Sequence, residues 1–229
     1  AKTVYIKRYN AFSWRYRVGS WFQFSGASKS LRGAAVLAES GIRTVQCLAA
    51  IETRSWGMLQ RSFFLSEEIP EGKTADVYWR EELLAMKGRR GLRLRRGFLQ
   101  DMGVFFNFLH EQGIYHNDLK DANIVISPGP EGEGTRFYLL DLEGVQRYRM
   151  LNRRRRIKNL VQLHRTLGSY LRRPDKLRFL KGYLGPAFSH KTTKRGSVAA
   201  VLKQSERLDG LRAMKHPPLG RAGNPAQES

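Results

Sequence analysis

Four polar residues with a fixed spacing lie between an apolar helix pattern and a short strand pattern. They are His116, Asp118, Lys120 and Asn123. An aspartate beside an attacking hydroxyl can orient it and accept its proton, and a lysine two residues later can face a transferring phosphate. The Asn123 side chain can hold a metal ion, and His116 is expected to fix the loop by hydrogen bonding. The set predicts phosphoryl transfer, with Asp118 as base and Lys120 at the phosphate.

Two further residues complete this chemistry at other places in the chain. Asp141 ends the apolar run of residues 137–140, one hairpin after Asn123, and is expected to be the principal Mg²⁺ ligand. Lys7 ends the run Val-Tyr-Ile-Lys and is expected to pair with the α- and β-phosphates of ATP. A surface lysine or a capped turn explains one such residue but not the ordered set, which matches the motifs of protein kinases.

Elements of both kinds must position these residues. Alternation predicts a strand at residues 3–9 that carries Lys7, and helical spacing predicts a helix at 28–40 that stops at Gly41. The remaining expected elements are strands at 45–52, 60–67, 123–127 and 136–140, and helices at 79–86, 97–112, 159–171 and 177–184.

This order of elements predicts an α+β, two-lobed protein-kinase-like fold. The small β-rich N-lobe is assigned to residues 1–68, and it begins so close to the Lys7 strand that a glycine-rich loop has no room before it. We expect the natural N-terminus to be missing. The mainly helical, reduced C-lobe is assigned to residues 69–186. Residues 187–229 are basic, polar and weakly periodic, and are expected to be a largely disordered tail.

Charge indicates the class of partner. Lys and Arg outnumber Asp and Glu by 41 to 20, a formal net charge of +21, which favours polyanionic partners. No nucleic-acid motif is recognisable, so no nucleic acid is expected. Basic clusters at residues 87–96 and 153–158 are either solvated helix faces or surfaces that hold the protein at an anionic membrane.

Cysteine content and hydropathy indicate the compartment. Cys47 is the sole cysteine, so one chain cannot build a disulfide framework or a thiolate zinc site, and a reducing, cytoplasmic setting is expected. No apolar run approaches the ~20 residues of a spanning helix. Any membrane contact is therefore expected to be peripheral.

The motifs together resemble the lipopolysaccharide core kinases, which have a protein-kinase-like fold. The resemblance spans roughly residues 4–184, and its marks lie at residues 5–9, 41–44, 63–68, 116–123, 140–143 and 178–183. It implies an ATP- and Mg²⁺-dependent kinase that phosphorylates Kdo or heptose of the lipopolysaccharide core, or another small glycolipid, at the cytoplasmic face of the bacterial inner membrane. It also places backbone groups near Glu68 and Ile69 against adenine.

Some residues depart from the protein-kinase pattern. Asn117 replaces the arginine that reads a phosphorylated activation loop, and no Ala-Pro-Glu motif follows Asp141, so a peptide acceptor is not favoured. Glu39 is the only acidic residue between Lys7 and Glu52, so a lysine-to-helix ion pair must use Glu39 or be absent. Two alternatives stay open: a kinase for another small molecule or an atypical protein kinase, and a membrane-associated pseudokinase scaffold.

Overall fold

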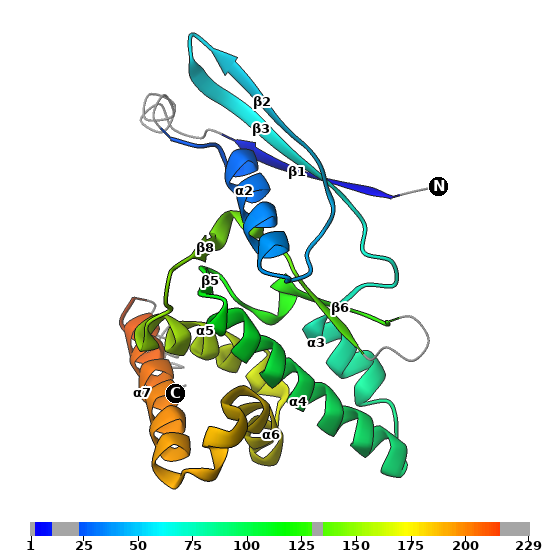
Figure 1. Cartoon of the computed structure of the whole chain (residues 1–229), viewed down its shortest axis with the longest axis vertical. Helices are drawn as coiled ribbons and strands as arrows, with labels where there is room; N and C mark the ends of the chain where they lie inside the picture. Colours follow the sequence, from blue (N-terminus) through cyan, green and yellow to red (C-terminus); the bar gives the residue numbers. More distant parts are fainter. Residues whose placement is uncertain (1–2, 11–22, 130–134, 216–229) are drawn as a thin grey trace, which may run out of the picture.

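The computed structural model describes residues 3–10, 23–129 and 135–215, with side chains to residue 211. The described chain forms two lobes (Figure 1): strands β1 to β3 and helix α2 form the upper N-lobe, and most of the helices form the lower C-lobe. This mixed architecture is the α+β, two-lobed kinase-like fold that the sequence predicts.

The N-lobe is built on a three-stranded antiparallel sheet in the order β1-β3-β2. Its elements are β1 (Val4–Asn10), α2 (Gly26–Glu39), β2 (Cys47–Ser55) and β3 (Met58–Glu67). Helix α2 begins two residues earlier than predicted because the Ser25 hydroxyl caps it, accepting a hydrogen bond from the Ser28 amide at 3.0 Å. It ends before Gly41, whose φ of +68° continues the chain in the left-handed region.

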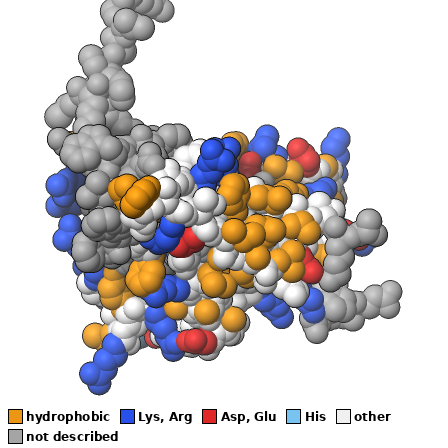
Figure 2. Space-filling model, turned by 90° about the horizontal axis from the view of Figure 1, so that it is seen from above, with side chains coloured by type: hydrophobic (Ala, Val, Ile, Leu, Met, Phe, Trp, Pro, Cys, Tyr) orange, Lys and Arg blue, Asp and Glu red, His pale blue; other side chains and the backbone are white. Residues whose placement is uncertain are grey.

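The sheet face that points away from the C-lobe carries a group of apolar side chains. Leu65 of β3 lies between Ile6 of β1 and Ala49 of β2 in the strand register. Two residues along β3 on the same face, Phe63 lies opposite Ile51 of β2. Ile6 is 64% exposed and Ile51 50% exposed, and apolar side chains gather on this side of the molecule (Figure 2). The N-lobe therefore has a solvent-exposed surface whose apolar side chains a partner could bury.

The C-lobe combines helices with short strands. Its helices are α3 (Ala75–Val77), a π-helix (Tyr78–Leu83), α4 (Gly88–Glu111), α5 (Arg153–Arg165), α6 (Arg173–Leu184) and α7 (Lys191–Lys215). Its strands are β4 (Lys73–Thr74), β5 (Ile114–His116), β6 (Ile124–Ser127), β7 (Arg136–Leu139) and β8 (Val145–Arg147). Short 3-10 turns lie at Asp121–Asn123, Leu142–Gly144, Leu167–Tyr170 and Gly185–Ser189. Strands β6 and β7 pair antiparallel, as predicted for the segments around Asn123 and Asp141.

Two helix predictions were too short at the N-terminus by six residues or more. Helix α4 starts at Gly88, where residues 88–96 lack a clean apolar period because their basic side chains face solvent. Helix α5 starts at Arg153 because the Asn152 side chain caps it, accepting from the Arg155 amide at 3.0 Å. Among the described residues, no helix is long and apolar enough to cross a bilayer.

The prediction of a disordered tail from residue 187 was wrong as far as residue 215. Helix α7 covers residues 191–215, and Val198 and Val201 pack against the core, as does Phe188 in the turn before it. The helix was missed because its few apolar residues contact α5 and the 3-10 turn before α7 without forming a clear amphipathic stripe. Residues 216–229 lie outside the described residues.

Two glycines let α4 and α6 pack with their backbones in contact. A Cβ on Gly103 of α4 would lie 2.2 Å from the Phe179 carbonyl oxygen of α6. A Cβ on Gly182 of α6 would lie 2.2 Å from the Gln100 carbonyl oxygen of α4. Both distances are far below van der Waals contact, so any larger residue forces the helices apart.

We predict that Gly103→Ala lowers the free energy of unfolding by about 1–3 kcal/mol, because overpacking displaces α6. The matched control is Gly97→Ala on the same helix, where a Cβ meets no atom within 4 Å. That change should raise the free energy of unfolding by about 0.5–1 kcal/mol through helix propensity and the unfolded chain. Urea denaturation measures both, and equal effects would contradict the close packing of α4 on α6.

Candidate active site

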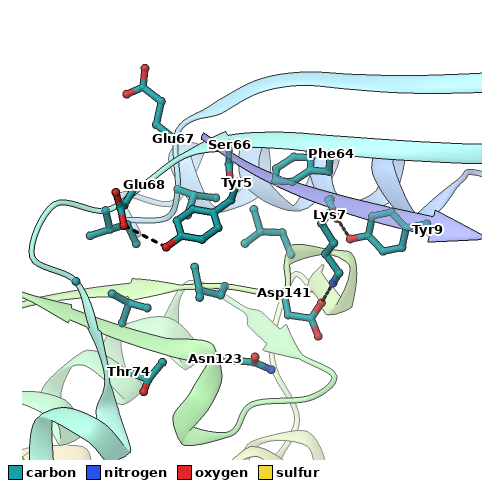
Figure 3. Close-up of a pocket in the computed structure, with 17 residues that line it drawn as sticks. Tyr5, Lys7, Tyr9, Phe64, Ser66, Glu67, Glu68, Thr74, Asn123 and Asp141 are labelled. Atoms are coloured by element: carbon teal, nitrogen blue, oxygen red, sulfur yellow. Dashed lines mark hydrogen bonds and ion pairs between the residues drawn. The ribbon is translucent and has the colours of Figure 1, made fainter. Parts of the chain in front are cut away.

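A cavity of about 540 Å³ lies between the two lobes (Figure 3). The N-lobe contributes Tyr5 and Lys7 from β1 and Phe64 from β3, and the C-lobe contributes Asn123 and Asp141. Lys7 and Asp141 meet at one end, Glu67 and Glu68 lie at the other, and the lining also includes four apolar side chains: Val45, Ile69, Val125 and Leu140. A cavity with an apolar part and a polar end suits a molecule with a ring at one end and phosphates at the other.

Lys7 projects into this cavity because the alternation of β1 turns Tyr5, Lys7 and Tyr9 to the same side. Its ammonium forms an ion pair with the Asp141 carboxylate (Figure 3). It also lies 3.9 Å from the nearer oxygen of Glu143. Burial lowers the pKa of Lys7, but hydrogen bonds to Asp141 and Tyr9 outweigh burial and raise it overall. Lys7 is therefore a cation held at the junction of the lobes.

Asp141 has an uncommon backbone conformation. Its φ of 57° and ψ of 53° lie in the left-handed region, which few residues other than glycine adopt, though aspartate tolerates it. The conformation turns the chain out of β7 and aims the carboxylate at Lys7. Such strain persists where the surrounding structure imposes it, and it clusters at functional sites.

His116 connects the loop that carries Asp118 to the strand that leads to Asp141. Its ring is fully buried, and Nε2 donates to the Leu140 carbonyl at 2.8 Å while Nδ1 accepts from the Asp118 amide at 3.2 Å. Burial lowers its pKa, so the ring stays neutral and keeps one donor and one acceptor. The expected positioning role of His116 is thus visible in its two hydrogen bonds.

Asp118 and Lys120 form an ion pair of 2.7 Å, and the Asp118 side chain is 52% exposed. The hydrogen bond to Asp118 raises the pKa of Lys120. Asn123 lies on the other side of the loop and lines the interlobe cavity, and its amide nitrogen donates to the Asp118 carbonyl at 2.7 Å. Its amide oxygen is then the atom that can meet a metal ion near Asp141.

The residues expected at the adenine end also line the cavity. Glu68 and Ile69 lie at its edge, and the Glu68 carboxylate accepts a hydrogen bond from the Tyr5 hydroxyl at 3.1 Å (Figure 3). This bond raises the pKa of Tyr5. Tyr5 and Glu68 thereby connect β1 to the segment that joins the lobes.

Of the two alternatives for Glu39, the structure shows the second: Lys7 and Glu39, which are both among the described residues, form no ion pair. The Glu39 carboxylate pairs with Arg147 of β8 at 3.5 Å, whereas Lys7 pairs with Asp141. The reason is the seating of α2: a Cβ on Gly33 would lie 2.1 Å from the Leu142 carbonyl oxygen, so the helix lies directly on the segment after Asp141. That contact carries the C-terminal end of α2, with Glu39, toward β8.

The chain matches the model of the lipopolysaccharide kinase (Kdo/WaaP) family over residues 15–183. The chain belongs to this family. It is therefore a phosphotransferase that acts on a sugar hydroxyl and uses ATP. Asp118, Lys120, Asn123 and Asp141 lie inside the matched segment of the kinase, whereas Lys7 precedes it and α7 follows it.

The kinase fold is also similar to a solved structure described as WaaP in complex with acyl carrier protein. The match has a TM-score of 0.61 at 24% identity, and it covers 80% of this chain and 76% of that chain. No curated protein matches the chain. The structural likeness supports the kinase-like fold.

Two residues of α5 that the sequence did not single out hold the loop that carries Asp118. Asn159 is fully buried, and its amide nitrogen donates to the His116 carbonyl at 2.6 Å. The Gln162 amide nitrogen donates to the Asn117 carbonyl at 2.5 Å, and its oxygen accepts from the Leu119 amide at 3.3 Å. The signal in the sequence was an Asn-x-x-Gln spacing within the apolar run of residues 159–163.

The buried His110 contacts the Asn159 side chain. His110 of α4 contacts the Asn159 side-chain oxygen through Nε2 at 3.4 Å and the Tyr183 hydroxyl through Nδ1 at 2.9 Å. Burial lowers the pKa of His110 to about 4, so it is neutral near pH 7. Helices α4, α5 and α6 thus share one polar network next to the loop that carries Asp118.

Proposed function

We propose that this kinase transfers the γ-phosphoryl group of ATP to a hydroxyl of a Kdo or heptose residue in the lipopolysaccharide inner core. One observation carries the proposal: Lys7 and Asp141, from opposite lobes, meet at the polar end of the interlobe cavity, with Asn123 beside them. Cation, carboxylate and amide are the groups that phosphoryl transfer from a nucleotide requires.

Each residue has a role in this proposal. Lys7 leaves the Asp141 carboxylate and binds the α- and β-phosphates, while the apolar cavity between Tyr5 and Ile69 takes the adenine. Asp118 orients the acceptor hydroxyl and accepts its proton. Lys120, which is paired with Asp118, faces the γ-phosphoryl group during transfer and offsets its negative charge.

The polar end of the cavity fits Mg²⁺. Asp141 and Asn123 supply a carboxylate and an amide oxygen, the hard oxygen ligands that Mg²⁺ prefers, and phosphates and water complete such sites. When bound, Mg²⁺ neutralises charge on the transferred group. Burial and the Asp141 charge raise the pKa of Glu143, which lies next to this end of the cavity, although Lys7 opposes the shift.

Asp118→Asn should reduce kcat for phosphate transfer by about 10²–10⁴-fold, because the side chain keeps its shape but loses the base. The substrates are ATP, Mg²⁺ and lipopolysaccharide trimmed to its deep core, and affinity for ATP should be unchanged, since Asp118 does not line the nucleotide cavity. Asp101→Asn, on the exposed face of α4, is the matched control and should retain activity.

Wild-type rates of phosphate incorporation in Asp118→Asn would rule out this mechanism. A wild-type protein that binds no nucleotide would instead favour the scaffold. Transfer to basic proteins, with none to glycolipid, would favour an atypical protein kinase.

We also propose that the protein binds peripherally to the cytoplasmic face of the inner membrane. The start of α4 supports it, because exposed Arg89, Arg90 and Arg93 alternate there with Leu92 and Leu94, which are 40% and 41% exposed. Apolar side chains among basic ones suit the boundary of an anionic bilayer, where each basic residue contributes about 1 kcal/mol.

Sedimentation with vesicles tests this placement. The protein should pellet with phosphatidylglycerol vesicles and not with phosphatidylcholine vesicles. Arg89→Glu/Arg93→Glu should weaken binding by about tenfold or more, since two attractive charges become repulsive. Lys203→Glu/Arg207→Glu on α7 makes the same change of charge elsewhere and serves as the control. Equal loss in both variants would show that net charge, and not the start of α4, governs binding.

A further inference from the structure

A second cavity, of about 640 Å³, lies on the other side of the catalytic loop. Asp118 and Lys120 line this cavity, whereas Asn123 and Asp141 line the nucleotide cavity. Helices α5 and α7 form its other walls. The loop therefore lies between the two cavities. The proposed base, Asp118, lines the second cavity and not the one that would bind the nucleotide.

The position of Asp118 indicates what the second cavity holds. A general base must lie within hydrogen-bond reach of the proton that it accepts, and this proton belongs to the acceptor hydroxyl. If Asp118 is the base, as the proposed function requires, the acceptor sugar must occupy this second cavity. The inference thus rests on the proposed function and extends it to the acceptor.

The charges that line this cavity are mainly positive. Lys120 is neutralised by Asp118, but Lys158 and Arg165 of α5 add two further cations. Lys158 lies 3.4 Å from the Asn117 amide oxygen and 5.4 Å from the centre of the Tyr115 ring, and no carboxylate of the described residues pairs with it. Arg165 is mostly buried and is held by an ion pair with Asp209 of α7.

Helix α7 closes the cavity on the side opposite the loop. It contributes Gln204, Leu208 and Leu211, an amide and two apolar side chains that suit the mixed faces of a saccharide. The family model ends at residue 183, so this wall is built by a part of the chain that the family match does not include. The acceptor cavity therefore combines family motifs with an element outside them.

We propose that this cavity is the acceptor site and that Lys158 and Arg165 bind an anionic substituent of the acceptor saccharide. The substituent is a carboxylate or a phosphate, because both accept charge-assisted hydrogen bonds from ammonium and guanidinium groups. Helix α7 is then a determinant of acceptor specificity. A neutral saccharide leaves the Lys158 ammonium without a counter-charge and binds more weakly.

Steady-state kinetics with three forms of deep-core lipopolysaccharide tests the proposal: untreated, carboxyl-reduced and dephosphorylated. Wild-type protein should show an acceptor KM raised about tenfold by one of the two treatments, the effect of losing one charge-assisted hydrogen bond. The treatment that raises KM identifies the substituent. If neither does, the proposal is overturned.

Variants of α5 locate the effect. Lys158→Gln and Arg165→Gln should each raise the KM for the untreated acceptor about tenfold while leaving kcat and the KM for ATP unchanged. In either variant, carboxyl reduction or dephosphorylation of the acceptor should change the acceptor KM by a smaller factor than in wild type. Arg154→Gln, an exposed change on the same helix away from the cavity, should match wild type. Variants that all match wild type overturn the proposal.

Asp209→Asn separates anion binding from a purely structural role of Arg165. The variant breaks the ion pair to α7 but keeps the guanidinium, so the acceptor KM should stay the same or fall. A rise equal to that of Arg165→Gln shows that the pair only seats α7, which overturns the role of Arg165. Wild-type protein that phosphorylates no form of lipopolysaccharide overturns the proposed function and this site with it. Activity that no variant affects overturns this site alone.

Discussion

The contact between Lys7 and Asp141 is the constraint on which the site depends, because it joins two residues 134 positions apart that belong to different lobes. It requires that β1 turn Lys7 inward and that Asp141 leave β7 in a left-handed conformation. The two side chains are 46% and 27% exposed, so the pair adds little to stability. Its importance is geometric: it marks where phosphates and a metal ion can be held by both lobes at once.

Other contacts hold the lobes in this relation. The Thr44 hydroxyl donates to the Leu139 carbonyl at 2.6 Å, and the Leu139 amide donates to the Arg43 carbonyl at 3.1 Å, so the segment after α2 pairs with β7. Gly33 lets α2 lie on the backbone of Leu142. In the C-lobe, His116 and Asn159 connect the Asp118 loop to β7 and to α5. The segments that carry Asp118, Asn123 and Asp141 are thus held mostly by hydrogen bonds between neutral groups.

The sequence predicted the parts of the site that are local. His116 to Asn123 form one loop, so their spacing alone carries the motif, and the alternation of β1 suffices to turn Lys7 inward. The sequence left the partner of Glu39 open because this partner depends on how α2 packs, which no local pattern encodes. Asn159 and Gln162 were missed because polar residues on a basic helix resemble a solvated face until burial is known.

The most direct test of the central claim is the effect of Mg²⁺ on ATP affinity, measured by titration calorimetry with Mg²⁺ and with EDTA. Asp141→Asn is the informative variant, because asparagine tolerates the left-handed backbone and changes only the charge. Wild-type protein should bind ATP more tightly with Mg²⁺ than with EDTA, and Asp141→Asn should largely lose this difference. An equal Mg²⁺ effect in both proteins would contradict the role of Asp141 as a metal ligand.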